Sequence, residues 1–211
     1  MVENILILDP GTSTGYCVIS VDNNKADIHT WGFIDIEHKE YAGDQYIELE
    51  NEIKKLINKH NITEVAVEDY FFSGKFAQGV NLNSAYRAII HMTCRKMNVP
   101  YTVINISLWK KFINGRTTPT KIQKQQWGKE AAKKLMTQES LWKRWNIRFP
   151  NYCLSSKTNK PIMFRFDIVD AIAMGIFFLC IHKNIQDWKY TVKKIKDVEF
   201  KRQSKKTFKY D

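Results

Sequence analysis

Residues 4–9 read NILILD, an apolar run that stops at an aspartate and is followed at once by Pro10 and Gly11. Such a run favours a buried strand, and the Pro-Gly pair indicates a tight turn. A carboxylate at the end of a buried strand is unfavourable unless a partner stabilises its charge. Asp9 is therefore predicted to be either a turn residue bonded to the backbone or a member of a polar site.

The remainder of the chain alternates between strand-like and helical patterns. Further strand patterns occur at 16–21, 27–36, 65–68 and 100–105. Apolar residues recur at helical spacing in the segments 42–60, 81–97, 108–113, 120–136 and 167–181. Ser107 is the predicted N-cap of the helix at 108–113. This order predicts an α/β fold with a mixed five-stranded sheet and helices on both of its faces.

We assign residues 1–182 to this domain, with an insertion at about 138–163, and residues 183–211 to a basic C-terminal tail. The most apolar stretch, residues 168–181, is 14 residues long and contains Asp170. A membrane span needs about 20 apolar residues, so this stretch is predicted to be a buried helix. With no recognisable signal peptide at the N-terminus, we expect an intracellular protein without a membrane partner.

The net charge of +11 is unevenly distributed along the chain. Residues 1–82 carry a net charge of −8, whereas residues 110–148 carry +9 and residues 183–211 carry +6. One interpretation is ordinary solubilising charge with a solvated tail. The asymmetry favours another, in which an acidic centre lies beside basic surfaces that contact nucleic acid. The four cysteines form no CxxC pair and the histidines no HxxxH pair, which argues against zinc and suits a reducing compartment.

Four carboxylates fall at the ends of predicted elements. Asp9 and Glu68 each close a strand, and Asp167 and Asp170 open the last helix on one helical face. If the first and fourth strands are neighbours, these acids meet. Oxygen ligands of this kind suit Mg²⁺ or Mn²⁺. Two such ions about 4 Å apart can activate water and stabilise the leaving oxygen of a phosphodiester.

Each of these residues also has a purely structural interpretation. Asp9 could begin a turn, and Asp167 could be a helix N-cap. Glu68 is followed by Asp69, and strand alternation directs only one of them toward a shared site. Asp170 is the hardest to explain by structure alone, because it interrupts an apolar run.

The same residues resemble the motifs of RuvC Holliday junction resolvases, which have an RNase H-like fold. ILDPGTSTGYCVI is similar to their first motif, VAVEDYFF to the second, and FDIVDAIAMGI to the last. The resemblance covers roughly residues 4–136 and 164–182. It implies a crossover junction endodeoxyribonuclease that acts on branched DNA as a homodimer and nicks a four-way junction symmetrically. The helix at 81–97 is our candidate for the dimer interface.

Carried over residue by residue, the resemblance implies a site with two Mg²⁺ ions, for which Mn²⁺ can substitute. Asp9, Glu68, Asp167 and Asp170 would be the ligands, with Asp9 bridging. Phe71 would match an aromatic residue that opens base pairs, with Tyr70 and Phe72 as alternatives. Lys110 and Lys121 would match basic residues near the active site, and Lys121 is the predicted catalytic lysine. Lys111, Arg116 and Lys124 are further candidates for phosphate contacts.

The insertion and the basic tail depart from the bacterial pattern. The insertion interleaves aromatic and cationic residues, namely Trp142, Lys143, Arg144, Trp145 and Arg148, which is consistent with an additional DNA contact or with a small packed lobe. Other functions that fit the sequence are an RNase H-like nuclease for flaps, forks or RNA–DNA hybrids, and a non-catalytic junction-binding protein. An actin-like ATPase fits less well, given the short length and the lysine-rich segment.

Overall fold

The computed structural model describes residues 2–11, 13–36, 39–69, 77–150, 152–154, 161–163 and 165–191. A six-stranded sheet has the order β5-β4-β1-β2-β3-β8. Its strands are β1 (Glu3–Asp9), β2 (Ser13–Asp22), β3 (Lys25–Asp35), β4 (Glu64–Glu68), β5 (Tyr101–Ile104) and β8 (Asp187–Tyr190). A separate antiparallel pair is formed by β6 (Tyr152–Leu154) and β7 (Pro161–Met163).

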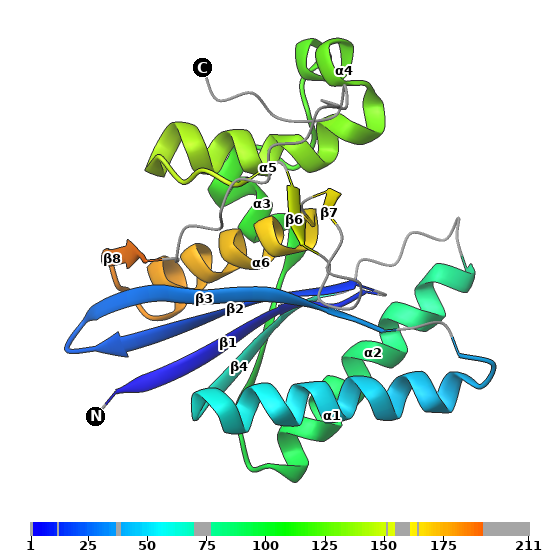
Figure 1. The fold of residues 1–211 in the computed structure, drawn as a ribbon. Coiled ribbons are helices and arrows are strands. Elements are labelled where there is room, and N and C mark those ends of the chain that lie inside the picture. The colour runs from blue at the N-terminus through cyan, green and yellow to red at the C-terminus, as the bar shows by residue number, and fades with distance from the viewer. Residues whose placement is uncertain are drawn as a thin grey trace.

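Helices lie on both faces of the large sheet (Figure 1). On one face are α1 (Ala42–His60) and α2 (Ala77–Lys96). On the other are α3 (Ile106–Asn114), α4 (Lys121–Trp127), α5 (Lys129–Trp145) and α6 (Phe166–Phe177), which continues into a π-helical turn, η1 (Phe178–His182). The predicted mixed sheet with helices on both faces is confirmed. In the described part of the chain, no helix combines the length and apolarity that a membrane crossing requires.

β1 is the central strand because its side chains supply both hydrophobic cores. Ile5 and Ile7 pack in the core beneath α6, whereas Leu6 and Leu8 pack in the core beneath α1 and α2. All four side chains have no exposed surface. The uninterrupted apolar run therefore reflects burial on both faces, as expected for a strand covered by helices from both sides.

The sheet has one strand more than the five that the sequence predicts. Residues 187–190, which we assigned to a basic tail, form β8 and pair in parallel with β3. Trp188 and Tyr190 pack against the core, and Lys189 pairs with Asp27 across the two strands. Alternating aromatic and charged residues in a four-residue strand are too short a pattern to distinguish from a tail. The assignment of residues 183–211 as a separate unit stays untested, and residues 192–211 lie outside the described part.

The lysine-rich helix predicted at 120–136 is divided in two. Gly128, with φ of +80°, ends α4 and begins α5, a conformation that glycine adopts without steric cost. α5 then runs to Trp145, so the first part of the predicted insertion is helical. The predicted N-cap of α3, Ser107, is also wrong. Asn105 is the N-cap, and its side chain accepts hydrogen bonds from the backbone N–H groups of Ser107 and Leu108.

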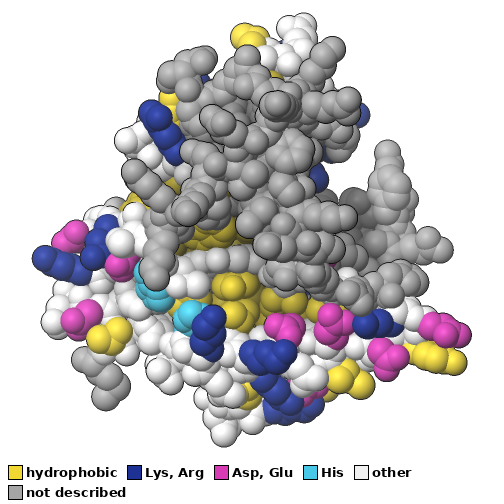
Figure 2. All heavy atoms as spheres, in the orientation of Figure 1, with side chains coloured by type: hydrophobic (Ala, Val, Ile, Leu, Met, Phe, Trp, Pro, Cys, Tyr) yellow, Lys and Arg dark blue, Asp and Glu magenta, His cyan; other side chains and the backbone are white. Residues whose placement is uncertain are grey.

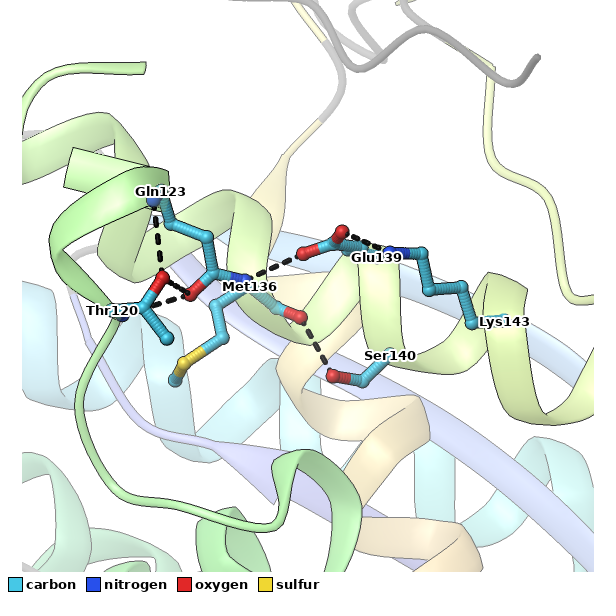
Figure 3. Close-up of polar contacts among 6 residues, drawn as sticks. All are labelled: Thr120, Gln123, Met136, Glu139, Ser140 and Lys143. Carbon is cyan, nitrogen blue, oxygen red and sulfur yellow. Dashed lines mark hydrogen bonds and ion pairs between the residues drawn. The ribbon is translucent and has the colours of Figure 1, made fainter. Parts of the chain in front are cut away.

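Side-chain hydrogen bonds hold α4 against α5, as Figure 3 shows. Thr120 and Gln123 form a capping box at the start of α4. The Gln123 side chain also donates to Glu139 of α5 at 2.6 Å, and Lys143 donates to the same carboxylate at 2.6 Å. The orientation of α4, which carries two of the candidate DNA-contacting lysines, is therefore fixed by α5.

Positive and negative charges are mixed on the α1 side of the molecule. The face shown in Figure 2 carries acidic and basic side chains close together along its lower edge. Glu50 of α1 pairs with both Lys54 and Lys96, at 2.6 and 2.9 Å. Acidic residues of the N-terminal half are thus partly neutralised locally, and the excess basic residues lie in α3, α4 and α5 on the opposite face of the sheet.

Candidate metal centre

Four carboxylates converge at one edge of the sheet. β1 and β4 are parallel neighbours with Leu8 opposite Val67, so Asp9 and Glu68 follow side by side at the carboxyl ends of the two strands. Asp167 and Asp170 come from the first turns of α6. The charges of Glu68, Asp170 and Asp167 each raise the pKa of Asp9. The convergence of the three elements predicted from the sequence is therefore present.

Each of the four carboxylates is partly exposed, yet protein surrounds it closely enough to perturb its ionisation. Burial raises the pKa of Asp9 well above its ordinary value, and the neighbouring acids raise it further. Burial also raises the pKa of Asp170, to about 7, with added effects from Glu68 and Asp167. The pKa of Glu68 and that of Asp167 are raised mainly by burial as well. Ionising all four acids at once is therefore unfavourable in the absence of a cation.

Neighbouring polar groups hold these carboxylates in place. The indole N–H of Trp109, a fully buried residue of α3, donates to Glu68 at 2.7 Å. A hydrogen bond also joins Glu68 to Asp9 and lowers the pKa of Glu68. Thr137 of α5 donates to Asp170. The orientation of three acids is therefore set by hydrogen bonds within the protein.

Two lysines act on the cluster electrostatically. Lys110 of α3 lowers the pKa of Asp9, Glu68 and Asp170, and its ammonium lies 5.0 Å from the Trp109 ring centroid. Lys134 of α5 lowers the pKa of Asp167. Lys110 was a candidate from the sequence. Lys134 was not, because a lysine on a lysine-rich helix carries no local signal of what it faces.

The other basic candidates are exposed on α3, on α4 and in the loop between them. Lys111 lies on α3, Arg116 in the loop that follows, and Lys121 and Lys124 on α4, where Lys121 is the first residue. Tyr70, Phe71 and Phe72, the aromatic candidates, lie outside the described residues. Their proposed role in opening base pairs stays a prediction.

The position of α6 depends on a close backbone contact at Gly15. A Cβ atom on Gly15 of β2 would lie 2.1 Å from the carbonyl oxygen of Asp167 and 2.8 Å from the backbone nitrogen of Ile168. Only glycine allows β2 to approach the first turn of α6 this closely. In the sequence, Gly15 is part of the motif ILDPGTSTGYCVI. No local pattern indicates its contact with α6, because Asp167 is more than 150 residues away along the chain.

The residues present fit a hard divalent cation. The donor set consists of carboxylate oxygens, which Mg²⁺ and Mn²⁺ prefer, and Asp9 and Asp170 share a single opposing cation in Lys110. Within the described ranges, no three acidic, histidine or cysteine side chains are already arranged as a metal cage. The four acids are therefore neighbours whose repulsion a cation would relieve.

The raised pKa of Asp170 predicts a pH-dependent response to metal. An unfolded aspartate ionises near pH 4, whereas folded Asp170 ionises near pH 7. The stability that this group contributes is full below about pH 4 and is lost as the pH rises through 7. A divalent ion binds the ionised form, so Mg²⁺ is expected to raise the melting temperature more at pH 8 than at pH 5.

Thermal melts in EDTA and in Mg²⁺ across this pH range measure the effect. Asp170→Asn is the matched variant, and its Mg²⁺-induced shift should be smaller and depend less on pH, while Asp9, whose pKa is also raised, keeps part of the dependence. An equal Mg²⁺ effect at pH 5 and pH 8 in the unmodified protein would contradict the assignment.

Comparison with known proteins places this site in a family. Residues 5–137 match the family described as crossover junction endodeoxyribonuclease RuvC. The chain belongs to the RuvC family. The matched residues include Asp9, Glu68 and Lys110 but end before α6. The inclusion of Asp167 and Asp170 in the site therefore depends on the geometry described above and on the sequence motif.

The sequences of individual RuvC proteins agree with this membership. The chain is 39% identical over 71 residues to the RuvC of a Sulfurovum species and 37% identical over 70 residues to that of Helicobacter acinonychis. Each alignment spans 33% of this chain and 44% of the relative, so it covers less than half of either protein.

Two solved structures share the fold. Thermus thermophilus RuvC in complex with a Holliday junction substrate has a TM-score of 0.60 at 15% identity, covering 88% of this chain and 97% of that one. The yeast mitochondrial Holliday junction resolvase has a TM-score of 0.54 at 13% identity, covering 84% and 78%. At these identities the likeness concerns the fold, and it supports the predicted RNase H-like, RuvC-type architecture.

Proposed function

We propose that this protein is a metal-dependent endodeoxyribonuclease that resolves four-way DNA junctions by paired symmetric nicks. The observation that carries the proposal is the convergence of Asp9, Glu68, Asp167 and Asp170, from three separate elements of a RuvC-family fold, beside Lys110. The related Thermus thermophilus protein was solved with a Holliday junction substrate, which supports the choice of substrate.

The four carboxylates would hold two Mg²⁺ ions, with Mn²⁺ as a substitute. Two ions about 4 Å apart supply an activated water and stabilise the departing 3′ oxygen in phosphodiester hydrolysis. The hydrogen bond from Trp109 holds the Glu68 carboxylate in place, and the hydrogen bond from Thr137 holds that of Asp170. Each of the four acidic residues keeps some exposed surface.

The exposed basic residues of α3, of α4 and of the loop between them would contact the DNA backbone. Lys111, Arg116, Lys121 and Lys124 are exposed on α3, the following loop and α4. Contacts between lysine or arginine and phosphates make binding strongly salt-dependent. In the homodimer that we propose, with α2 as its interface, these surfaces would lie on both halves of a symmetric junction. Tyr70 and Phe71 would contact bases near the crossover. We place its site of action inside the cell.

Lys110 and Lys121 are the two candidates for a lysine at the scissile phosphate. The position of Lys110 beside three of the carboxylates favours it, because a cation there can stabilise charge that develops on the phosphate. We expect Lys110→Met to lower the cleavage rate by roughly 10²-fold, the size of effect seen when one such group is removed. Lys111→Met, on the next residue of the same helix, is the control and should mainly weaken DNA binding.

Single-turnover cleavage at saturating protein separates these effects, since a loss of binding disappears under that condition. Lys121→Met is measured in parallel. A larger loss in Lys121→Met than in Lys110→Met would restore Lys121 as the catalytic lysine.

A cleavage assay with synthetic substrates tests the function itself. The substrates are a four-way junction, a replication fork, a flap, a linear duplex and an RNA–DNA hybrid, each end-labelled and incubated with Mg²⁺, Mn²⁺ or EDTA. We expect two symmetric nicks in the junction, none in EDTA and little cutting of duplex. Preferential cutting of the fork, flap or hybrid would instead indicate another RNase H-like nuclease. Junction binding without any cleavage would indicate a non-catalytic protein.

A further inference from the structure

A second site lies at the far end of α6 from the carboxylates. A pocket of about 650 Å³ opens between the end of α5 and β8, with Phe112 and Cys180 among its lining residues. Cys180 follows Asp170 by ten residues, which at 1.5 Å per helical residue corresponds to about 15 Å. The pocket is therefore separate from the candidate metal centre.

Aromatic rings form much of this pocket. The ring centroids of Trp145 and Trp188 are 6.0 Å apart with an interplanar angle of 54°, and both side chains are partly exposed. Tyr190 also lines the pocket and packs edge-on against Phe149 at 6.4 Å. Partly exposed indole faces are surfaces on which an unpaired base can stack.

The charges in the pocket are positive. Arg144 and Lys189 line it, and no acidic residue is among its lining residues in the described structure. The Arg144 guanidinium lies 4.3 Å from the Trp145 ring centroid and donates to the backbone carbonyls of Phe112 and Ile113, the latter at 2.9 Å. Its position is thus fixed before any ligand arrives. Lys189 contributes to the lining, but its ammonium pairs with Asp27 at 3.3 Å on the face of β8 opposite to Trp188 and Tyr190, because side chains alternate along a strand.

We propose that this pocket binds an unpaired nucleotide of single-stranded DNA. The base would stack on Trp188 beside Trp145, and the adjoining phosphate would contact Arg144. The volume lies within the range of about 300–1,000 Å³ that is usual for sites of small ligands. Stacking faces combined with fixed cations are how proteins bind single strands without base preference.

Most of the pocket lies outside the residues that match the family. Apart from Phe112, its lining residues lie after residue 137, where the family match ends. They come from the end of α5 and from η1 through β8. The site goes beyond junction cleavage, and its test does not depend on the proposed nuclease activity.

Fluorescence anisotropy of the full-length protein with a labelled oligo(dT) strand, in EDTA, tests the proposal. We expect the strand to bind more tightly than a duplex of equal length. Trp188→Ala should weaken single-strand binding by about fivefold or more, in line with the loss of one stacked base. Trp188→Phe, which keeps a stacking face, should recover most of the affinity. A thermal melt of each variant shows whether it is folded.

A charge substitution provides an independent arm. Arg144→Gln removes the cation that lies over the Trp145 ring, and it should weaken binding of the single strand by about two- to fivefold at low salt. Lys143→Gln, on the preceding residue of α5, is its matched control, because Lys143 pairs with Glu139 and does not line the pocket. It should bind as the unmodified protein does.

Three results would overturn the proposal. One is the absence of binding to oligo(dT) by the full-length protein. Another is equal affinity for the duplex. The third is an equal loss in Arg144→Gln and Lys143→Gln, which would reflect net charge alone.

Discussion

Asp9→Asn is expected to abolish metal-dependent cleavage of a four-way junction, lowering the rate by at least about 10³-fold while leaving the fold intact. The amide has the shape of the carboxyl but lacks the negative oxygen that a divalent ion requires. Asp9 is also the acid on which the charges of Glu68, Asp167 and Asp170 all act, so it lies at the centre of the cluster.

The same substitution should make the metal-free protein more stable. Burial and three neighbouring acids raise the pKa of Asp9, so its ionised form is unfavourable at neutral pH, and a neutral amide removes that cost. Asp9→Asn is therefore predicted to melt at a higher temperature in EDTA and to lose most of the Mg²⁺-induced rise. Loss of activity with a gain in stability is a combination that misfolding does not produce.

Asp44→Asn is the matched control for this experiment. Asp44 is an exposed acid in the first turn of α1, on the other face of the sheet. Its replacement should leave cleavage and the response to Mg²⁺ unchanged. If Asp9→Asn cuts junctions in Mg²⁺ as fast as the unmodified protein, the metal-centre assignment is wrong.

Gly15→Ala is expected to have the second largest effect. The added methyl group would meet the backbone of α6 at 2.1 Å from the Asp167 carbonyl oxygen, so either β2 or the start of α6 has to move. Overpacking of this kind costs about 1–3 kcal/mol of stability. It should also lower cleavage by roughly 10²-fold, because a shift of about 1 Å in a catalytic group has that consequence.

Gly43→Ala tests whether the effect is specific to this contact. Gly43 is in α1, and a Cβ atom there has no heavy atom within 4 Å. Alanine favours a helix by up to about 1 kcal/mol over glycine, so this variant should be slightly more stable and fully active. Melting temperatures and junction cleavage for both variants provide the comparison. A Gly15→Ala variant with unchanged stability and activity would contradict the close contact.

The candidate site could be predicted largely because its acids interrupt strong local patterns. Asp9 and Glu68 end apolar strands, and Asp170 breaks an apolar helix, so each is conspicuous in the sequence. Their meeting point followed from the parallel pairing of β1 with β4, which the order of elements favours. The helices on both faces of the sheet followed from the same order.

The residues that support the acids could not be predicted, because their roles arise only in the tertiary structure. Trp109 and Thr137 look like ordinary helix residues, yet each donates a hydrogen bond to one of the acids. β8 was missed for a related reason: four residues of alternating pattern form a strand only because β3 offers an unpaired edge. In each case the deciding partner is distant along the chain.

The order in which the acids occur has a consequence during synthesis. Asp9 and Glu68 emerge from the ribosome early, whereas Asp167 and Asp170 belong to α6, near the end of the described chain. The hydrophobic core beneath α6 is also incomplete until that helix arrives. A nascent chain therefore has no complete acidic cluster, and any nuclease activity that depends on all four acids begins only when translation has passed α6.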